Sequence, residues 1–234
     1  MMRGLIAGLS LAAAPAEACR LALVLAIDVS SSVDATEDAL QRQGLAAALI
    51  APEVQAAFFA SSDPVALYVF EWSGRYNQVA LSDWRMIETP GDLDAVAAAV
   101  SSSIRSHNDF PTAMGHALGH AATVLQNGPR CLFQTIDMAG DGINNEGFGP
   151  IEAYDAFPLG DVTVNGLVVN AADFEGEVNL IPFYTNEVIR GPGAFVEVAN
   201  SFADYETAMR RKLVRELGVI GLSGWPAAAD RSPS

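Results

Sequence analysis

Asp28, Ser30 and Ser32 form an Asp-x-Ser-x-Ser pattern directly after an apolar run, Leu21 to Ile27. Because side chains alternate across an extended chain, all three residues can face one side, which sets one carboxylate and two hydroxyls around a single point. Hard oxygen donors of this kind suit a hard divalent cation. The alternative is a serine-rich turn that only caps the following helix, which would explain Ser32 but not the aspartate that ends the run.

Two further oxygen-bearing side chains belong to this candidate metal site. Thr112 lies in a loop before a predicted helix, and Asp141 follows a second apolar run, Cys131 to Ile136, within a Gly-Asp-Gly segment. In an open parallel sheet, ligands bind beyond the carboxyl ends of the strands, so Asp28 and Asp141 are expected to meet there if their strands flank the point where strand order reverses. A helix cap for Thr112 and a turn residue for Asp141 are the alternatives.

The elements that would position these residues alternate between short apolar runs and longer helical stretches. This pattern is typical of a doubly wound α/β fold, in which a mostly parallel central sheet has helices on both faces. A hairpin at Ser73-Gly74 predicts one antiparallel edge strand. The predicted strands are residues 21–28, 65–72, 76–81, 131–136, 162–169 and 194–199, and the predicted helices are residues 34–59, 89–104, 113–126 and 204–217.

In their order over this alternation, the five candidate ligands resemble the metal-ion-dependent adhesion site of von Willebrand factor type A domains: Asp28, Ser30, Ser32, Thr112 and Asp141. The resemblance covers residues 19–217. Segments 29–34, 140–145 and 165–167 are more narrowly similar to a group of exported bacterial proteins of this superfamily. Two residues depart from better-studied relatives: Pro111 precedes the threonine where glycine is common, and Gly140 precedes the aspartate where threonine is common.

The resemblance implies a bound divalent cation, Mg²⁺ or alternatively Mn²⁺ or Ca²⁺. Ser30, Ser32 and Thr112 would hold it, with Asp28 and Asp141 binding directly or through water. Mg²⁺ prefers octahedral oxygen coordination, and one position would stay open for an outside ligand. In this superfamily that ligand is often an Asp or Glu carboxylate of a protein partner. We therefore expect a cation-dependent protein-binding module for adhesion or recognition.

Catalysis is the main alternative class. A serine nucleophile at residue 30 or 32 needs a histidine base, and none of the three histidines lies in a motif that places one there. We therefore expect no enzyme and rank a metal-dependent hydrolase second, ahead of a metal-independent component of envelope assembly. His116 and His120 lie one helical turn apart, but the sequence has no glutamate between them as in metalloproteases, so zinc binding is disfavoured.

Three polar residues close to Asp141 leave two interpretations open. Asp137 lies four residues earlier, inside the predicted strand, where a buried carboxylate needs a partner. It would either support the site from behind or face a helix terminus. Asn144 and Asn145 would either support the site or serve as turn residues, and the turn role is favoured.

The first 18 residues have the pattern of a signal peptide. Arg3 precedes an apolar stretch, and Ala16-Glu17-Ala18 fits a cleavage site, so cleavage is expected near Ala18. The stretch is shorter than the roughly 20 residues of a membrane span, and Glu17 fits poorly with a lipoprotein signal at Cys19. We expect a soluble, periplasmic or secreted product with no transmembrane span. The predicted parts are a signal peptide at residues 1–18, one domain at residues 19–217 and a loose tail at residues 218–234.

Cys19 and Cys131 lie nine and ten residues before Asp28 and Asp141. If their strands are parallel neighbours, the two sulfurs start side by side at one sheet edge. A disulfide would then suit an oxidising compartment, and two unpaired buried thiols are the alternative.

The net charge is −15 and stays so without residues 1–18, because Arg3 and Glu17 are lost together. Such a charge repels nucleic acid phosphates and anionic lipid surfaces, so no nucleic acid partner is expected.

Overall fold

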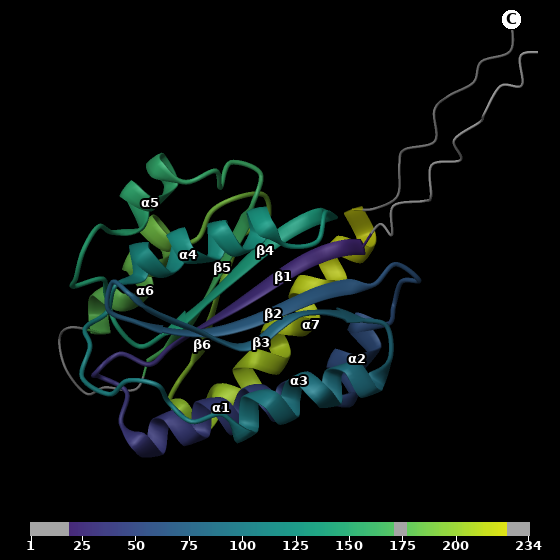
Figure 1. The fold of residues 1–234 in the computed structure, drawn as a ribbon, viewed down its shortest axis with the longest axis horizontal. Helices are drawn as coiled ribbons and strands as arrows, with labels where there is room; N and C mark the ends of the chain where they lie inside the picture. Colours follow the sequence, from purple (N-terminus) through teal and green to yellow (C-terminus); the bar gives the residue numbers. More distant parts are fainter. Residues whose placement is uncertain (1–18, 171–176, 224–234) are drawn as a thin grey trace, which may run out of the picture.

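A computed structural model describes residues 19–170 and 177–223 (Figure 1). The predicted signal peptide, residues 1–18, and residues 224–234 of the predicted tail lie outside the described residues. The strands are β1 (Cys19–Asp28), β2 (Val65–Ser73), β3 (Asn77–Ile87), β4 (Cys131–Gly140), β5 (Thr163–Val169) and β6 (Val196–Ala199). The α-helices are α1 (Ala35–Leu49), α2 (Pro52–Phe58), α3 (Pro90–Ser102), α4 (Met114–Asn127), α5 (Pro150–Ala156), α6 (Leu180–Phe183) and α7 (Tyr205–Ser223). Three shorter turns are η1 (Glu177–Asn179), η2 (Tyr184–Val188) and η3 (Phe202–Asp204).

The six strands form one sheet in the order β3-β2-β1-β4-β5-β6. Every neighbouring pair is parallel except β2 and β3, which confirms the doubly wound α/β class with one antiparallel edge strand. Strand order reverses at β1, because β2 follows on one side and β4 on the other. The register pairs Ile27 with Ala139, so Asp28 and Gly140 are the next residues along two neighbouring strands. The crevice at the switch point of the sheet therefore opens between them.

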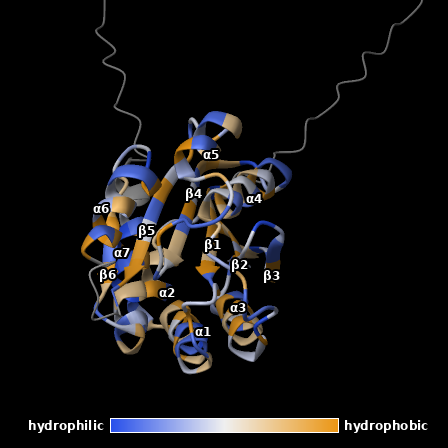
Figure 2. Cartoon of the chain, turned by 90° about the vertical axis from the view of Figure 1, so that its left-hand side faces the viewer, coloured by the Kyte–Doolittle hydropathy of each residue, from blue (hydrophilic) through white to orange (hydrophobic). Residues whose placement is uncertain are grey.

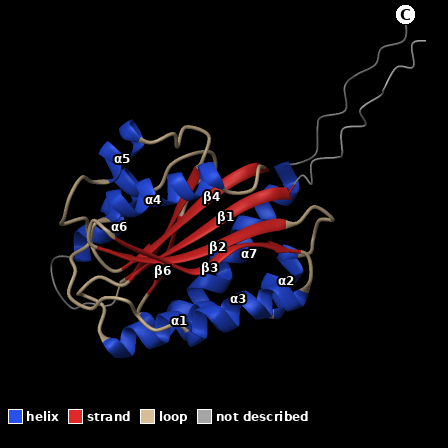
Figure 3. Ribbon diagram, in the orientation of Figure 1, coloured by secondary structure: helices blue, strands red, loops and turns tan. Residues whose placement is uncertain are grey.

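Helices cover both faces of the sheet, as Figures 1 and 3 show. The helices α1, α2, α3 and α7 pack on one face, and α4, α5 and α6 pack on the other. Every residue of β1 is buried, with leucines and Ile27 toward the first face and smaller residues such as Ala22 and Ala26 toward the second. Figure 2 shows orange, hydrophobic residues on β1. Burial of a large aliphatic side chain contributes roughly 1.5–3 kcal/mol, so this strand is a rigid base for the loop that follows it.

The predicted single helix from Asp34 to about Phe59 is wrong, because the structure has two helices here. Pro52 begins α2. A proline has no backbone N–H, and its ring clashes with the preceding helical turn, so α1 cannot continue through this residue. The start of α1 agrees with the prediction: Asp34 accepts hydrogen bonds from the backbone N–H groups of Thr36 and Glu37 at 2.6 and 2.9 Å. The serine loop is thus short, running from Asp28 at the end of β1 to Asp34 at the start of α1.

Several boundaries extend beyond the predicted ones. β3 continues to Ile87 and β4 to Gly140, and α7 continues to Ser223 instead of ending at Leu217. The sequence pattern did not indicate α5 or the helical turns at residues 177–188. No helix in the described ranges is both long and apolar enough to cross a bilayer.

A disulfide joins Cys19 to Cys131, as one of the two sequence interpretations predicted. The two residues are register partners at the amino ends of β1 and β4, with Cα atoms 4.6 Å apart. The covalent link therefore fastens the two strands whose carboxyl ends carry Asp28 and Asp141.

Candidate metal centre

The structure gathers the five predicted site residues at the carboxyl edge of the sheet. The Thr112 hydroxyl donates to Ser30 Oγ at 3.1 Å, and the hydroxyls of Ser30 and Ser32 lie 3.2 Å apart. Ser32 Oγ donates in turn to Asp141 Oδ1 at 2.9 Å, and the Ser30 N–H donates to Asp28 Oδ1 at 2.7 Å. One continuous set of contacts thus links side chains that come from three separate loops.

Burial grades from the base of this site to its mouth. Asp28 and Ser30 are fully buried and Thr112 is 3% exposed, whereas Ser32 is exposed and Asp141 is partly exposed. The site therefore has a dry base of one carboxylate and two hydroxyls. Its mouth offers a hydroxyl and a carboxylate to solvent, where an outside ligand can approach.

Electrostatics at the base oppose an ionised Asp28 when no cation is present. Burial, followed by the nearby charge of Asp141, raises the pKa of Asp28 to about 8. Hydrogen bonds from Ser30 and the charge of Arg105 act in the opposite direction but do not cancel this rise. Two carboxylates in one poorly solvated site gain stability from a positive charge between them.

The residues present fit a hard divalent cation. Asp28 Oδ2 is buried and has no hydrogen-bond partner, although a buried polar atom normally has one. The neighbouring donors are hydroxyl and carboxylate oxygens, which suit Mg²⁺, Mn²⁺ or Ca²⁺. Among the described residues, no group of three or more His, Cys, Asp or Glu side chains forms an alternative metal cluster.

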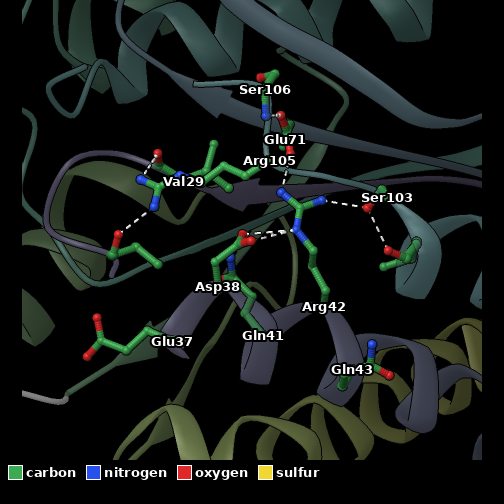
Figure 4. Close-up of polar contacts among 12 residues, drawn as sticks. Val29, Glu37, Asp38, Gln41, Arg42, Gln43, Glu71, Ser103, Arg105 and Ser106 are labelled. Carbon is green, nitrogen blue, oxygen red and sulfur yellow. Dashed lines mark hydrogen bonds and ion pairs between the residues drawn. The ribbon is translucent and has the colours of Figure 1, made fainter. Parts of the chain in front are cut away.

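Arg105, which the sequence analysis did not identify, holds the serine loop from outside. Its guanidinium donates to the backbone carbonyls of Val29, Ser30 and Val33 at 2.6 to 2.7 Å, as Figure 4 shows beside Val29. Its Nε donates to the carbonyl of His107 at 2.8 Å. A single side chain thus ties the first site loop to the loop that leads to Thr112.

A buried ion pair positions the segment that carries Arg105. Arg42 of α1 pairs with Asp38 and with Glu71 of β2, and it also donates to Ser103 Oγ at 2.6 Å (Figure 4). Glu71 Oε1 accepts from the backbone N–H of Ser106 at 2.8 Å. These charges lie in the interior and are fully paired, which is the condition under which buried charges are tolerated.

The loop after β4 holds Thr112 in place. Asn145 Oδ1 accepts from the Thr112 N–H at 2.9 Å, and the Asn145 N–H donates to the Thr112 carbonyl at 2.9 Å. Asn144 Oδ1 accepts from the N–H of Gly115 at 3.3 Å. Asn145 therefore supports the site through Thr112, against the turn role favoured from the sequence, whereas Asn144 ties the same loop to the first turn of α4. Pro111, the unusual residue before the threonine, accepts a hydrogen bond from the Gly74 N–H through its carbonyl.

Other candidate residues lie away from the site. Asp137 faces the opposite side of the sheet, where it pairs with the buried Lys212 of α7, so it does not support the site from behind. His116 stacks on Phe148 with ring centroids 4.0 Å apart. His120 packs against Phe70, and burial lowers its pKa. Both histidine rings thus pack against aromatic rings.

Comparisons with known proteins agree with this architecture. A family model described as "Protein of unknown function (DUF1194)" matches residues 18–220. No curated protein matches the chain. Among solved structures, the chain is similar to proximal thread matrix protein 1 from the mussel byssus with a zinc-occupied MIDAS motif (TM-score 0.58, 18% identity, 86% of this chain and 48% of that chain).

Two further solved structures show the same similarity. A von Willebrand factor type A protein from Catenulispora acidiphila has a TM-score of 0.56 and 16% identity over 86% of this chain and 43% of its own. The pilus adhesin SpaC from Lactobacillus rhamnosus GG has a TM-score of 0.58 and 13% identity over 87% of this chain and 31% of its own. The chain spans less than half the length of each of these three proteins. At such low identity the similarity shows the fold, which is that of von Willebrand factor type A domains.

Proposed function

The chain belongs to the family described as "Protein of unknown function (DUF1194)", a description that names no activity, and from the site itself we propose a divalent-cation-dependent protein-binding module. Asp28, Ser30, Ser32, Thr112 and Asp141 would hold the cation, with Mg²⁺ as the first candidate and Mn²⁺ or Ca²⁺ as alternatives. The partner would be a protein that offers an Asp or Glu carboxylate.

The observation that carries this proposal is the fully buried carboxylate of Asp28 at the base of a connected set of hydroxyls. A carboxylate in this environment gains from a cation, and no charged side chain of the described residues forms an ion pair with it. When bound, the cation supplies a positive charge that a partner's carboxylate can approach from the exposed side of Ser32 and Asp141. The protein's own residues supply the rest: they orient the oxygens and exclude water from the base.

Relatives in fold support a binding role. The mussel protein is a matrix protein whose MIDAS motif holds zinc, and SpaC is a pilus adhesin. The hydroxyls of Ser30 and Ser32 contact each other, Thr112 and Asp141, so a histidine base is not among their contacts in the described structure. We therefore propose binding ahead of hydrolysis.

The net charge of −15 bears on how a partner is recognised. A protein of this charge repels an acidic partner at long range. Recognition would depend on the local field of the cation, which implies weak binding without it. We propose a periplasmic or secreted location, which the disulfide supports because such bonds persist in oxidising compartments.

Cation binding is tested first by calorimetric titration and by thermal unfolding with Mg²⁺, Mn²⁺ or a chelator. Wild-type protein should bind and be stabilised, and the Asp28→Ala and Asp141→Ala variants should lose both effects. Asp161→Ala is the matched control, because this exposed carboxylate precedes β5 at the opposite edge of the sheet. Equal stabilisation of wild type and Asp28→Ala would refute the metal site.

Partner binding is tested next, by capture from envelope extract with the wild-type protein and the Asp28→Ala variant in Mg²⁺ or chelator. A partner retained only by wild type and only in Mg²⁺ supports the proposal. Capture that persists in chelator would point instead to metal-independent assembly. Metal-dependent turnover of generic phosphoester or peptide substrates, lost in Asp28→Ala, would favour a hydrolase.

A further inference from the structure

Two polar atoms beside the metal centre are buried without a hydrogen-bond partner: Asp28 Oδ2 and the hydroxyl of Tyr184. Both residues are fully buried. A buried tyrosine hydroxyl usually finds a partner, and a buried carboxylate oxygen almost always does. Their occurrence side by side calls for a common explanation.

Gly140 shows how close the two atoms lie. A Cβ atom built on this glycine would stand 2.8 Å from the Tyr184 hydroxyl oxygen and 2.9 Å from Asp28 Oδ2. Both atoms therefore face the same small space, and that space exists because residue 140 has no side chain. A larger residue at this position would push one of the two oxygens away.

A second glycine places the tyrosine ring. A Cβ atom on Gly166 would stand 2.7 Å from Tyr184 Cδ1, so the ring lies directly on the backbone of β5. Gly140 pairs with Val168, two residues further along β5, and Gly166 therefore lies on the same face of the sheet as Gly140. The ring extends from Gly166 on β5 toward Gly140 on β4, with its hydroxyl at the carboxyl edge next to Asp28.

The backbone around Tyr184 is also unusual. Tyr184 begins η2, a π-helical turn that follows α6 directly. Such turns are rare and occur frequently at functional sites, where the extra residue changes the direction of a side chain. Here the turn delivers a tyrosine to a site whose other members lie in loops far away in the sequence.

We propose that Tyr184 is a positioning residue of the metal centre, whose hydroxyl is hydrogen-bonded to Asp28 Oδ2 through one bridging water. Its role toward the cation rests on the function proposed above. With Ser30 N–H on Oδ1 and Tyr184 on Oδ2, the Asp28 carboxylate is held at both oxygens. The orientation of this ligand is then set before a cation arrives. Partners of this kind strongly affect metal affinity in other proteins.

Tyr205 provides a matched control. It is also fully buried, and its hydroxyl also has no hydrogen-bond partner in the described structure. It packs in the core on the other face of the sheet, with its ring against Gly44 of α1. Tyr205→Phe therefore removes an equivalent buried hydroxyl without touching Asp28.

The first experiment measures the pairing without any cation. Urea unfolding in chelator is recorded for wild type, Tyr184→Phe, Asp28→Ala and the double variant. We expect the unfolding constant of the double variant to differ by about fivefold or more from the value obtained by multiplying the effects of the two single changes. The corresponding cycle with Tyr205→Phe should show no deviation. Independent effects of Tyr184→Phe and Asp28→Ala would overturn the proposal, whether or not the protein binds a cation.

The second experiment measures Mn²⁺ affinity by calorimetry. Tyr184→Phe should weaken binding roughly tenfold, whereas Tyr205→Phe should leave it within about twofold. Equal affinities of wild type and Tyr184→Phe would overturn the positioning role while leaving the metal site in place. Failure of wild type to bind any cation would instead remove the proposed function and with it the positioning role. The cycle in chelator would then test only whether Tyr184 and Asp28 are hydrogen-bonded.

Discussion

Replacing Asp28 by asparagine should stabilise the cation-free protein and abolish its response to cations. The change keeps the shape of the side chain, and the asparagine Oδ1 can still accept from the Ser30 N–H, which lies 2.7 Å from Asp28 Oδ1. It removes a charge that is fully buried and lies near a second carboxylate, Asp141. A substitution in the base of a binding site thus becomes a gain in stability.

The magnitude follows from the shift of the Asp28 pKa, which is raised from 3.8 to about 8. Because the folded-state pKa is the higher one, this residue favours the folded state fully below pH 3.8, and that contribution is lost as the pH rises toward 8. One pKa unit corresponds to 1.36 kcal/mol, so the full loss is on the order of 5 kcal/mol. Relaxation and water entry around a buried charge reduce such figures, and a gain of about 2–3 kcal/mol at pH 8 is expected for Asp28→Asn.

The assay is urea unfolding at pH 8 in chelator, followed by tryptophan fluorescence, since Trp72 is fully buried in the core. The measurement is repeated at pH 5, where the difference between the variant and wild type should shrink. At a Mg²⁺ concentration about a hundredfold above the dissociation constant, wild type should gain about 2.7 kcal/mol and the variant nothing. Asp161→Asn, an exposed carboxylate, should change stability by less than about 0.5 kcal/mol in either condition.

Two results would refute the reasoning. If Asp28→Asn is less stable than wild type in chelator at pH 8, the buried charge does not strain the cation-free protein. If the difference in stability is the same at pH 5 and pH 8, its origin is not the ionisation of Asp28. Either result would leave the geometry of the loop intact and remove the electrostatic argument.

Three further predictions concern the same framework. Cation affinity should increase from pH 6 to pH 8 because the proton on Asp28 must leave, and titrations in two buffers should show proton release; an affinity independent of pH would contradict this. Arg105→Gln loses the bonds to the carbonyls of the serine loop and should cost about 2 kcal/mol and weaken cation binding, whereas Arg85→Gln, which alters a surface ion pair, should do neither. Removing the disulfide by Cys19→Ser and Cys131→Ser should cost about 2–4 kcal/mol equally in Mg²⁺ and in chelator; a larger loss in one condition would mean that the bond acts on the site.

The parts of the fold that follow from local pattern and strand register were predictable from the sequence. Alternation placed Asp28, Ser30 and Ser32 together. The similar distances of Cys19 and Cys131 from Asp28 and Asp141, nine and ten residues, favoured the disulfide that the structure contains. The same alternation could have placed Asp137. Its neighbour Met138 and the site-lining Gly140 share one face of β4, so Asp137 had to face α7.

Long-range support of the site was not predictable, because it depends on the paths of loops. Arg105 donates to carbonyls more than 70 residues earlier in the chain. Every residue has a backbone carbonyl, so the sequence does not show which ones an arginine will bind. Tyr184 lies in a helical turn that no periodic pattern of apolar residues predicted. Gly140 was a visible clue, since a missing side chain beside a candidate ligand leaves room for another group. Only the three-dimensional arrangement identifies that group as a tyrosine.

The direction of β1 gives the domain two distinct poles. The strand runs from the disulfide at Cys19 to Asp28, which separates the two by about 30 Å. Arg20 donates to the backbone carbonyl of Leu217, so the late part of α7 lies at the disulfide pole as well. A tag or a solid support coupled at the end of α7 would therefore leave the opposite pole facing outward. Biosensor chips and affinity resins prepared in this way should present the serine loop to the solution unobstructed.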